Sequence, residues 1–419
     1  MKKILVFTFV LSMFSFESKA QCPANDSTSM GSSTSSDVFY NFANHTVSTI
    51  SNTNWHMAFS VQASRFPTNP ANGVAIRVNS GGNGTVLKKL NGANAANWRA
   101  IDTAGLSKLP TLLDSDSTWD LSAFTKGYKI SDPFNFVWGS YNATTHNVEG
   151  TNVYVLYNNA AGWYKKVFVK ECAFDSLWTV VISNLDNSDS NNIVINKKSY
   201  PNKLFVYYNA STNQLIDREP VKSSWDLVWT KYVTFVTSQQ GSGFYPVAGV
   251  LSNPSVTVEQ NNGKKCNEVW LNNRTSAVNP SISAIGHDWK TFTGTAYVIT
   301  DTFVYFVKGQ DGKMYKMTFK GYAGGPLGKS TFNFYEAKTS ISEVSPNHAF
   351  SVYPNPNNGV LSIQSDINIL TVNVIDMQGK TVFSSNTAEM MDISSLSNGM
   401  YVISLNTSEG VYHQQIIKE

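Results

Sequence analysis

The sequence predicts an all-β protein with two tandem β-rich repeats and a small β-sandwich at the C-terminal end. Aromatic residues make up 13% of the 419 residues and charged residues only 15%. Aromatic and β-branched residues favour half-buried pleated strands, whereas Asn and Gly favour turns. Short apolar runs bounded by turn residues indicate the strands, and tryptophans that recur at equal spacing indicate the repeat.

The N-terminal residues have the pattern of a secretory signal peptide. Lys2 and Lys3 provide a positive start, residues 4–16 are mainly apolar, and residues 18–20 (Ser-Lys-Ala) offer small residues at a cleavage position. The apolar run is too short to span a bilayer, and no other stretch approaches the length that a membrane helix needs. We therefore expect residues 1–20 to be removed on export and the mature protein to have no transmembrane segment.

Three cysteines, Cys22, Cys172 and Cys266, leave the disulfide pattern open. Export implies a compartment that permits disulfides, and three cysteines allow at most one bridge within the chain. Cys172 with Cys266 is the pairing that we consider first. Cys22 also raises the question of a lipid anchor, but the residue before it, Gln21, is not small, which favours free export.

The charge balance argues against nucleic acid as a partner. The formal net charge is +3, and the predicted signal peptide carries most of it. The mature chain is therefore close to neutral. A surface that binds phosphates needs clustered Lys and Arg residues, and no such cluster stands out in the sequence.

Strands are predicted wherever aromatic and branched residues form runs of five to seven between clusters of Asn, Gly or Asp. Regular runs of this kind are typical of a sandwich or a barrel. The Asp-Gly step inside residues 309–313 predicts a hairpin turn. The clearest strand runs are 153–157, 166–170, 204–208, 295–299 and 314–319.

Two pairs of tryptophans carry the internal repeat. Trp55 and Trp225 are 170 residues apart, and so are Trp119 and Trp289. We expect these tryptophans to pack in the core of each copy. The first copy contains an insertion at about 125–148 that is rich in Phe, Tyr, Trp and Asn. Loops on rigid β scaffolds often carry function, so this insertion is where we expect a binding loop.

These patterns divide the chain into five segments. A flexible leader of small polar residues precedes the repeats, and polar linkers are expected at 186–198 and 337–347. The segments are a signal peptide (1–20), the flexible leader (21–36), a first β repeat (37–185), a second β repeat (199–336) and a C-terminal domain (348–419).

Residues 348–419 resemble the type A C-terminal sorting domain of the type IX (Por) secretion system. Three motifs occur in order: YPNPNNG at 353–359, VIDMQGK at 374–380 and ISSLSNGMYV at 393–402. The resemblance implies a small Ig-like β-sandwich, recognition by the type IX machinery and transport across the outer membrane. The residues that carry the match are Pro354, Asn355, Pro356, Gly359, Asp376, Gly379, Leu396, Gly399 and Tyr401.

Residues 37–336 resemble, as two copies, the HmuY-like family of secreted or surface haem-binding proteins. The resemblance rests on a strand with Tyr and Asn followed by a "W-D-x-x-F" strand. The second copy has Tyr207-Tyr208-Asn209 and then Trp225-Asp226, and the first copy has Phe39-Tyr40-Asn41 and then Trp55-His56. His56 therefore stands where the pattern has Asp. The resemblance implies a β-rich repeat that binds haem at hairpin tips through His or Met.

Four residues are the candidate axial ligands that this resemblance implies. His146 lies in the aromatic insertion, and His287 precedes Asp288, a carboxylate that can orient its ring. His56 and Met57 lie side by side in a predicted strand, where simple packing competes with ligation.

The sequence contains none of the common catalytic signatures, so we expect a binding protein and not an enzyme. It has no G-x-S-x-G turn, no H-E-x-x-H pair, no phosphate-binding loop and no cysteine spacing that suits zinc. Haem is the ligand implied by the resemblance. A surface adhesin or glycan-binding protein is the alternative, because exposed Trp and Tyr beside Asn and Asp suit the stacking of sugars.

Overall fold

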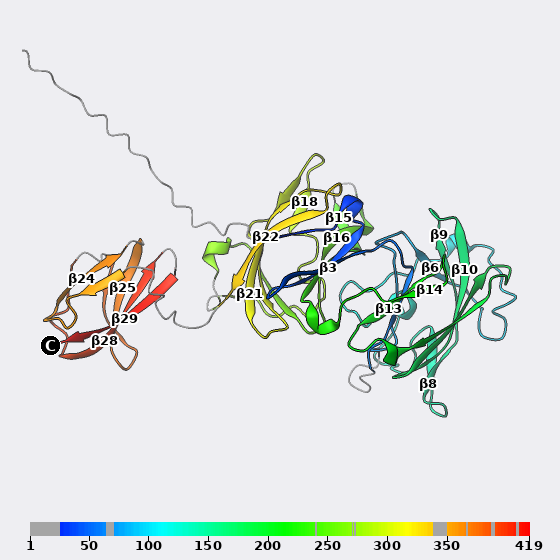
Figure 1. Ribbon diagram of the computed structural model, residues 1–419, viewed down its shortest axis with the longest axis horizontal. Coiled ribbons are helices and arrows are strands. Elements are labelled where there is room, and N and C mark those ends of the chain that lie inside the picture. Colours follow the sequence, from blue (N-terminus) through cyan, green and yellow to red (C-terminus); the bar gives the residue numbers. More distant parts are fainter. Residues whose placement is uncertain are drawn as a thin grey trace, which may run out of the picture. The chain divides into compact units, whose positions relative to one another are not determined.

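The computed structural model describes residues 26–63, 71–238, 241–269, 271, 274–337, 350–365, 368–386, 390–407 and 410–419. The chain divides into two compact units, a body up to residue 337 and a C-terminal unit beyond it. The described residues contain strands and short 3₁₀ turns (Figure 1), which confirms the all-β prediction. The predicted signal peptide and the linker at 338–347 lie outside the described residues.

The first half of the body forms a β-sandwich that we call the first sandwich. Its buried core is shared by the two sheets and includes Phe59, Trp138 and Trp178. One sheet has the order β14-β13-β4-β5, and the other contains seven strands in which β9 joins β6 to β10. The strands are β4 (Met57–Ser60), β5 (Ile76–Val78), β6 (Val86–Lys89), β7 (Gly139–Asn142), β8 (Asn147–Gly150), β9 (Val153–Asn158), β10 (Trp163–Ala173), β11 (Leu177–Asn184), β12 (Asn191–Asn196), β13 (Phe205–Asn209) and β14 (Gln214–Ile216).

The second sandwich combines the N-terminal strands with the second half of the body. Its sheets have the orders β16-β15-β2-β3 and β1-β22-β21-β20-β17, and the hairpin β18-β19 stands beside them. Tyr40, Trp229 and Trp289 lie in its core. The strands are β1 (Asp26–Ser29), β2 (Ser36–Asn41), β3 (His45–Ser51), β15 (Leu227–Ser238), β16 (Gly241–Ser252), β17 (Thr257–Asn261), β18 (Lys290–Phe292), β19 (Tyr297–Ile299), β20 (Val304–Lys308), β21 (Met314–Tyr322) and β22 (Lys329–Glu336).

In two places, a strand of one repeat pairs with a strand of the other, and the two pairs have the same register. Tyr40 of β2 lies opposite Leu227 of β15, and Tyr208 of β13 lies opposite Met57 of β4. The N-terminal strands thus complete the second sandwich, and Figure 1 shows their blue ribbons among the green and yellow strands of the second half. A third buried cluster joins the two four-stranded sheets, so the two sandwiches form one body.

Most predicted strands are present, whereas two segments differ from expectation. The hairpin at 309–313 joins β20 to β21 as predicted. Residues 26–36, expected to be flexible, include β1, because buried Thr28 and Met30 anchor them and β1 pairs with β22. Residues 191–196, expected in a linker, form β12, because Ile193 and Ile195 point into the core of the first sandwich.

The pairing of Cys172 with Cys266 is wrong. Cys172 is a buried free thiol whose Sγ lies near the carbonyl oxygen of Gly73 in the first sandwich. Cys266 lies in the second sandwich and is disulfide-bonded. The other cysteine of that bond lies outside the described residues. Cys172 belongs to the core of the first sandwich, whereas Cys266 is buried beside Asn333 of the second sandwich, so the two sulfur atoms do not meet.

The C-terminal unit is a seven-stranded sandwich, as the sequence predicts. Its sheets have the orders β23-β24-β27 and β26-β25-β28-β29. Val372, Ile403 and Leu405 lie in its core. The strands are β23 (Phe350–Tyr353), β24 (Val360–Ser365), β25 (Ile369–Ile375), β26 (Thr381–Ser385), β27 (Met391–Asp392), β28 (Gly399–Thr407) and β29 (Gly410–Lys418).

Candidate functional site

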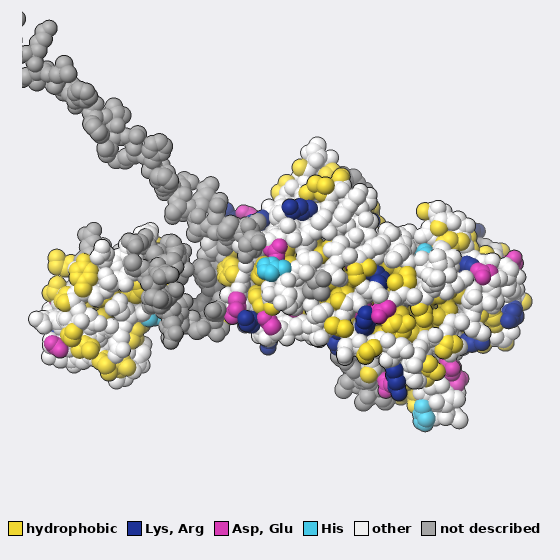
Figure 2. Space-filling model, in the orientation of Figure 1, with side chains coloured by type: hydrophobic (Ala, Val, Ile, Leu, Met, Phe, Trp, Pro, Cys, Tyr) yellow, Lys and Arg dark blue, Asp and Glu magenta, His cyan; other side chains and the backbone are white. Residues whose placement is uncertain are grey.

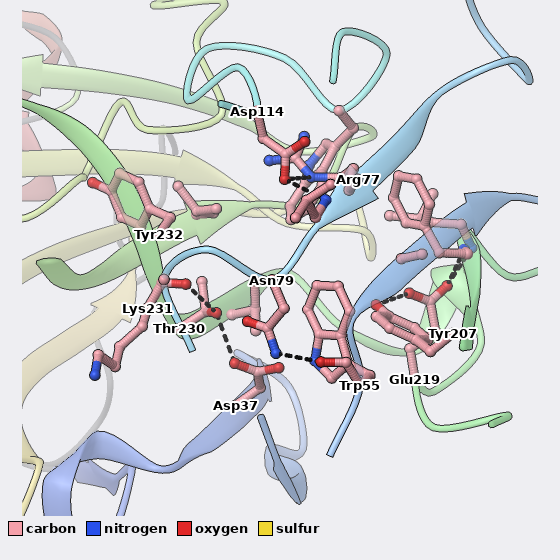
Figure 3. Close-up of a pocket in the computed structure, with 18 of the residues that line it drawn as sticks. Asp37, Trp55, Arg77, Asn79, Asp114, Tyr207, Glu219, Thr230, Lys231 and Tyr232 are labelled. Atoms are coloured by element: carbon pink, nitrogen blue, oxygen red, sulfur yellow. Dashed lines mark hydrogen bonds and ion pairs between the residues drawn. The ribbon is translucent and has the colours of Figure 1, made fainter. Parts of the chain in front are cut away.

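A cavity lies where the two four-stranded sheets of the body meet, and we call it the junction cavity (Figure 3). Trp55 and Trp225 line it from equivalent positions in the two repeats. Trp55 packs edge-on against Tyr207 at 4.9 Å, and Trp225 packs edge-on against Phe39 at 5.1 Å. Each ring pair joins a residue of one repeat to a residue of the other. Both walls of the cavity therefore depend on the pairing of strands between the two repeats.

Two arginines of the cavity are held by neighbouring groups. Arg218 forms an ion pair with Asp37 at 2.8 Å, and its guanidinium lies over the ring of Tyr207 at 4.8 Å. Arg77 lies 3.7 Å from Asp114 and over the ring of Trp119 at 5.0 Å. These guanidinium groups cover aromatic faces that a sugar or another flat ligand would need.

Glu219 is the titratable group of the cavity with the most perturbed environment. Burial raises its pKa to about 7, although the backbone N–H groups of Phe205 and Leu204 and the hydroxyl of Tyr207 all donate to it. The Phe205 and Tyr207 bonds both measure 2.9 Å. Burial therefore favours the protonated carboxyl of Glu219, so the stability of the junction depends on pH.

The junction cavity suits water or a small polar molecule. The centres of water-sized molecules can occupy about 80 Å³ of it, which is room for a few waters. The indole N–H groups of Trp55 and Trp225 and the Nε of Arg218 have no hydrogen-bond partner. A molecule that enters must therefore bring acceptors. Among the described residues, no His or Met lines the cavity, so these residues offer haem no axial ligand there.

His56 and Met57 serve the packing of the first sandwich. The Nδ1 of His56 accepts a hydrogen bond from the backbone N–H of Ala210 at 2.9 Å, and burial lowers its pKa to about 4. Asp226 has the equivalent role in the second repeat, where its carboxylate accepts a hydrogen bond from the N–H of Phe42 at 2.9 Å. Met57 is fully buried in the core.

His146 lies at the tip of the β7–β8 hairpin inside the predicted insertion. The side chain is exposed, and its Nδ1 lies 2.8 Å from the hydroxyl of Tyr141, a contact that fixes the ring. Phe134 stacks on Tyr141 at 5.4 Å. The insertion is only partly a loop, because Trp138 belongs to the buried core of the first sandwich.

His287 lies in the second sandwich and is half-buried. Burial lowers its pKa, and the neighbouring Lys290 lowers it further. The Nζ of Lys290 donates to the carbonyl of Ala248 at 2.6 Å and lies over the ring of Trp289 at 4.2 Å. His56, Met57, His146 and His287 therefore lie in separate environments, and these four residues do not together form a haem slot.

Two hairpins of the second sandwich expose aromatic side chains, and we call them the aromatic hairpins. On β15–β16, Phe235 and Phe244 lie opposite each other, 56% and 62% exposed, with their rings 5.5 Å apart. On β18–β19, exposed Phe292 lies opposite Tyr297 at 5.1 Å. Figure 2 shows hydrophobic side chains on the hairpin that projects near β18. The alternation of apolar and polar residues indicates which rings share a face of each hairpin. It does not show whether that face is buried or exposed.

No metal-binding cluster is found in the part of the chain that the structure describes. There, no group of three or more His, Cys, Asp or Glu side chains could hold a metal ion. A membrane-spanning helix is likewise not found among the described residues.

The YPNP motif of the C-terminal unit binds the last strand of the chain. The side chain of Asn355 accepts from the N–H of Ile417 at 2.8 Å and donates to the carbonyl of Gln415 at 3.0 Å. The side chain of Asn357 donates to the carbonyl of Ile417 at 2.9 Å. Pro354 and Pro356 flank these contacts without donating an N–H, which suits an irregular edge.

The other motif residues fix turns and packing. Gly359 has a φ of +104°, and a Cβ there would lie 2.6 Å from the Cα of Ser394, so only glycine fits. The Asp376 carboxylate accepts from the N–H of Lys380 at 2.9 Å across a turn that includes Gly379. The Tyr401 hydroxyl donates to the carbonyl of Ser397 at 2.7 Å. Leu396 packs against the core, and Gly399 begins β28.

Comparison with known families decides the role of the C-terminal unit. Residues 351–419 match the secretion system C-terminal sorting domain. The protein is exported. The match confirms the resemblance of this segment to type IX sorting domains, and it places the protein at the cell surface or in the extracellular space. The sorting domain implies an interaction with the type IX machinery.

The body has no such match. No HmuY-like family model matches the chain, so the haem-binding resemblance stays a prediction. No curated protein matches the chain.

Proposed function

We propose that this exported protein is a non-catalytic surface adhesin that binds glycans through its aromatic hairpins. The observation that carries the proposal is the pair of facing aromatic side chains on each hairpin, left exposed on a body whose other large rings are mostly buried. Exposed apolar patches on a secreted protein are typical of interaction sites, because solvation of bare rings is unfavourable.

Glycans are the proposed ligand class because of what surrounds the rings. The exposed residue Thr237 lies on the same hairpin as Phe235 and carries a hydroxyl. Rings contact the C–H face of a sugar, and hydroxyl side chains both donate to and accept from sugar hydroxyls. The junction cavity is a weaker candidate, because arginines of the chain already cover its aromatic faces.

A glycan array probed with the labelled mature chain tests the proposal. We expect binding to a restricted set of glycans and at least a tenfold loss in the double variant Phe235→Ser/Phe244→Ser, since stacking of each ring is worth about 1 kcal/mol or more. Leu327→Ser is the matched control, because Leu327 is 60% exposed and lies outside both hairpins. Binding that survives the double variant, or no binding to any glycan, contradicts the proposal.

Haem binding is the second candidate, and His146 is the observation that favours it. Its position at a hairpin tip is the one that the HmuY-like resemblance implies, and the Tyr141 contact at Nδ1 leaves Nε2 available. Titration of haem into the mature chain tests it. A saturating shift of the Soret band that His146→Ala abolishes supports this candidate, and an unsaturable shift equal to that of a non-binding control protein rejects it.

A further inference from the structure

The two aromatic hairpins carry no charged side chain. Residues 232–247 form the outer part of the β15–β16 hairpin, and residues 291–300 form the β18–β19 hairpin beyond Lys290. Neither range contains Asp, Glu, Lys, Arg or His, although charged residues make up 15% of the chain. The exposed rings therefore stand on hairpins whose own side chains are all neutral.

Neutral hydroxyl groups share the face of the ring pair on β15–β16. Phe235 lies opposite Phe244, and Thr237 lies opposite Ser242 two positions nearer the tip. Residues two positions apart in a strand point to the same face. Thr237 and Ser242 are both exposed. A ligand that stacks on the rings thus meets hydroxyl groups, which donate and accept hydrogen bonds without a charge.

The charged groups nearest the bases of these hairpins already have partners. The Nζ of Lys290 donates to the carbonyl of Ala248, and the carboxylate of Asp116 accepts from the hydroxyl of Thr234. Lys231, which precedes the uncharged range, lines the junction cavity. None of these three charges belongs to the exposed face that carries the rings.

The charges that follow β19 attract one another. Asp301 lies 4.0 Å from the Nζ of Lys265 and acts electrostatically on Lys320 of β21 as well. An anionic ligand would compete with this carboxylate for either lysine. A cationic ligand would compete with the two lysines for Asp301.

We infer that the aromatic hairpins select neutral glycans and reject sugars that carry a carboxylate, a sulfate or a free amine. This inference rests on the proposed glycan-binding function and narrows its ligand class. A charged group that is placed against a ring loses water and needs an opposite charge in return. The hairpins offer no such charge, whereas their hydroxyl groups suit the hydroxyl groups of a neutral sugar.

An array that presents each glycan core in neutral, sialylated and sulfated forms tests the inference with the labelled mature chain. We expect binding to neutral forms, and no acidic form bound more tightly than its neutral core. Binding should change by less than about twofold between roughly 0.05 and 0.5 M NaCl, because salt screens contacts between charges and leaves neutral contacts intact. Tighter binding of acidic forms, or binding that falls steeply with salt, overturns the inference.

Two variants separate this inference from the proposed function. Ser242→Lys places a cation beside the rings and should raise binding to sulfated forms by roughly threefold. Lys265→Gln/Lys320→Gln is the matched control and should bind neutral forms as the wild type does. Loss of binding in this control overturns the inference while glycan binding itself stands. A wild-type chain that binds no glycan overturns the proposed function, and this inference with it.

Discussion

His56 and Asp226 satisfy the same backbone requirement in the two repeats with different chemistry. In each repeat, an N–H just after the Tyr-Asn strand points at this position and needs an acceptor. Asp226 offers a carboxylate to Phe42, and neutral His56 offers Nδ1 to Ala210. The departure of His56 from the pattern is thus explained by hydrogen bonding. Its Nδ1 is occupied by this hydrogen bond and its side chain is buried, so this histidine is poorly placed to bind a cofactor.

Replacement of His56 by Leu should destabilise the body by about 1–3 kcal/mol, because the N–H of Ala210 loses its acceptor. His56→Asp should cost less, since a carboxylate at the equivalent position already serves the second repeat. Unfolding in guanidinium, followed by tryptophan fluorescence, measures both variants. The signal reports on the body, because Trp289 is the last tryptophan of the chain. Equal losses for the two variants would show that the hydrogen bond is unimportant.

Glu219 predicts how stability depends on pH. Burial raises its pKa from 4.5 to about 7, so the folded body holds this proton more tightly than the unfolded chain. Stability from this group is full below pH 4.5 and falls as the pH rises to about 7. The loss is on the order of 3 kcal/mol. Glu219→Gln should remove this dependence and gain relative stability towards pH 8. Parallel pH profiles for wild type and Glu219→Gln would contradict the assignment.

At the scale of elements, the positions of strands could be predicted but their partners could not. Alternation and turn residues are local, so runs such as 153–157 and the hairpin at 309–313 were predictable. Pairing of β2 with β15 joins residues almost two hundred positions apart, and no local pattern encodes it. For the same reason, the sequence predicts a linker where β12 forms, because the core contacts of Ile193 and Ile195 come from other segments.

The sequence shows which residues are of a type that can bind haem. It does not show the environment of each one. His146 and Met57 carry similar weight in a sequence, yet one is exposed at a hairpin tip and the other is fully buried. The aromatic hairpins were missed because the same alternation predicts either a buried or an exposed face. The sorting motif was predictable in detail, since its Asn, Pro and Gly residues act within a single small unit.

The C-terminal strand β29 depends on the amides of the YPNP motif. Asn357→Ala removes the side-chain donor to Ile417 and the acceptor for the N–H of Gly359. Loss of these two hydrogen bonds should cost about 1–3 kcal/mol within the sorting domain. We expect faster hydrogen exchange of residues 410–418 and less protein exported to the medium. Unchanged exchange and export would mean that the motif serves another purpose.

At the scale of the whole molecule, the N-terminal strands close the body. Residues 26–51 pair with β15 and β22, so the second sandwich is incomplete until both ends of the body have met. The first sandwich, by contrast, is continuous from β4 to β14. The aromatic hairpins belong to the second sandwich, and their display therefore depends on strands at the other end of the body.

Hydrogen exchange of a chain with residues 26–51 deleted tests this exchange of strands most directly. The structure predicts that amides of residues 227–336 lose their protection, because Tyr40 and its neighbours leave the second core. Amides of residues 57–216 should largely keep theirs. If the deletion instead exposes residues 57–216 and spares 227–336, each repeat pairs within itself. The pairing of strands between the two repeats would then be wrong, and so would the equivalent roles of His56 and Asp226 that follow from it.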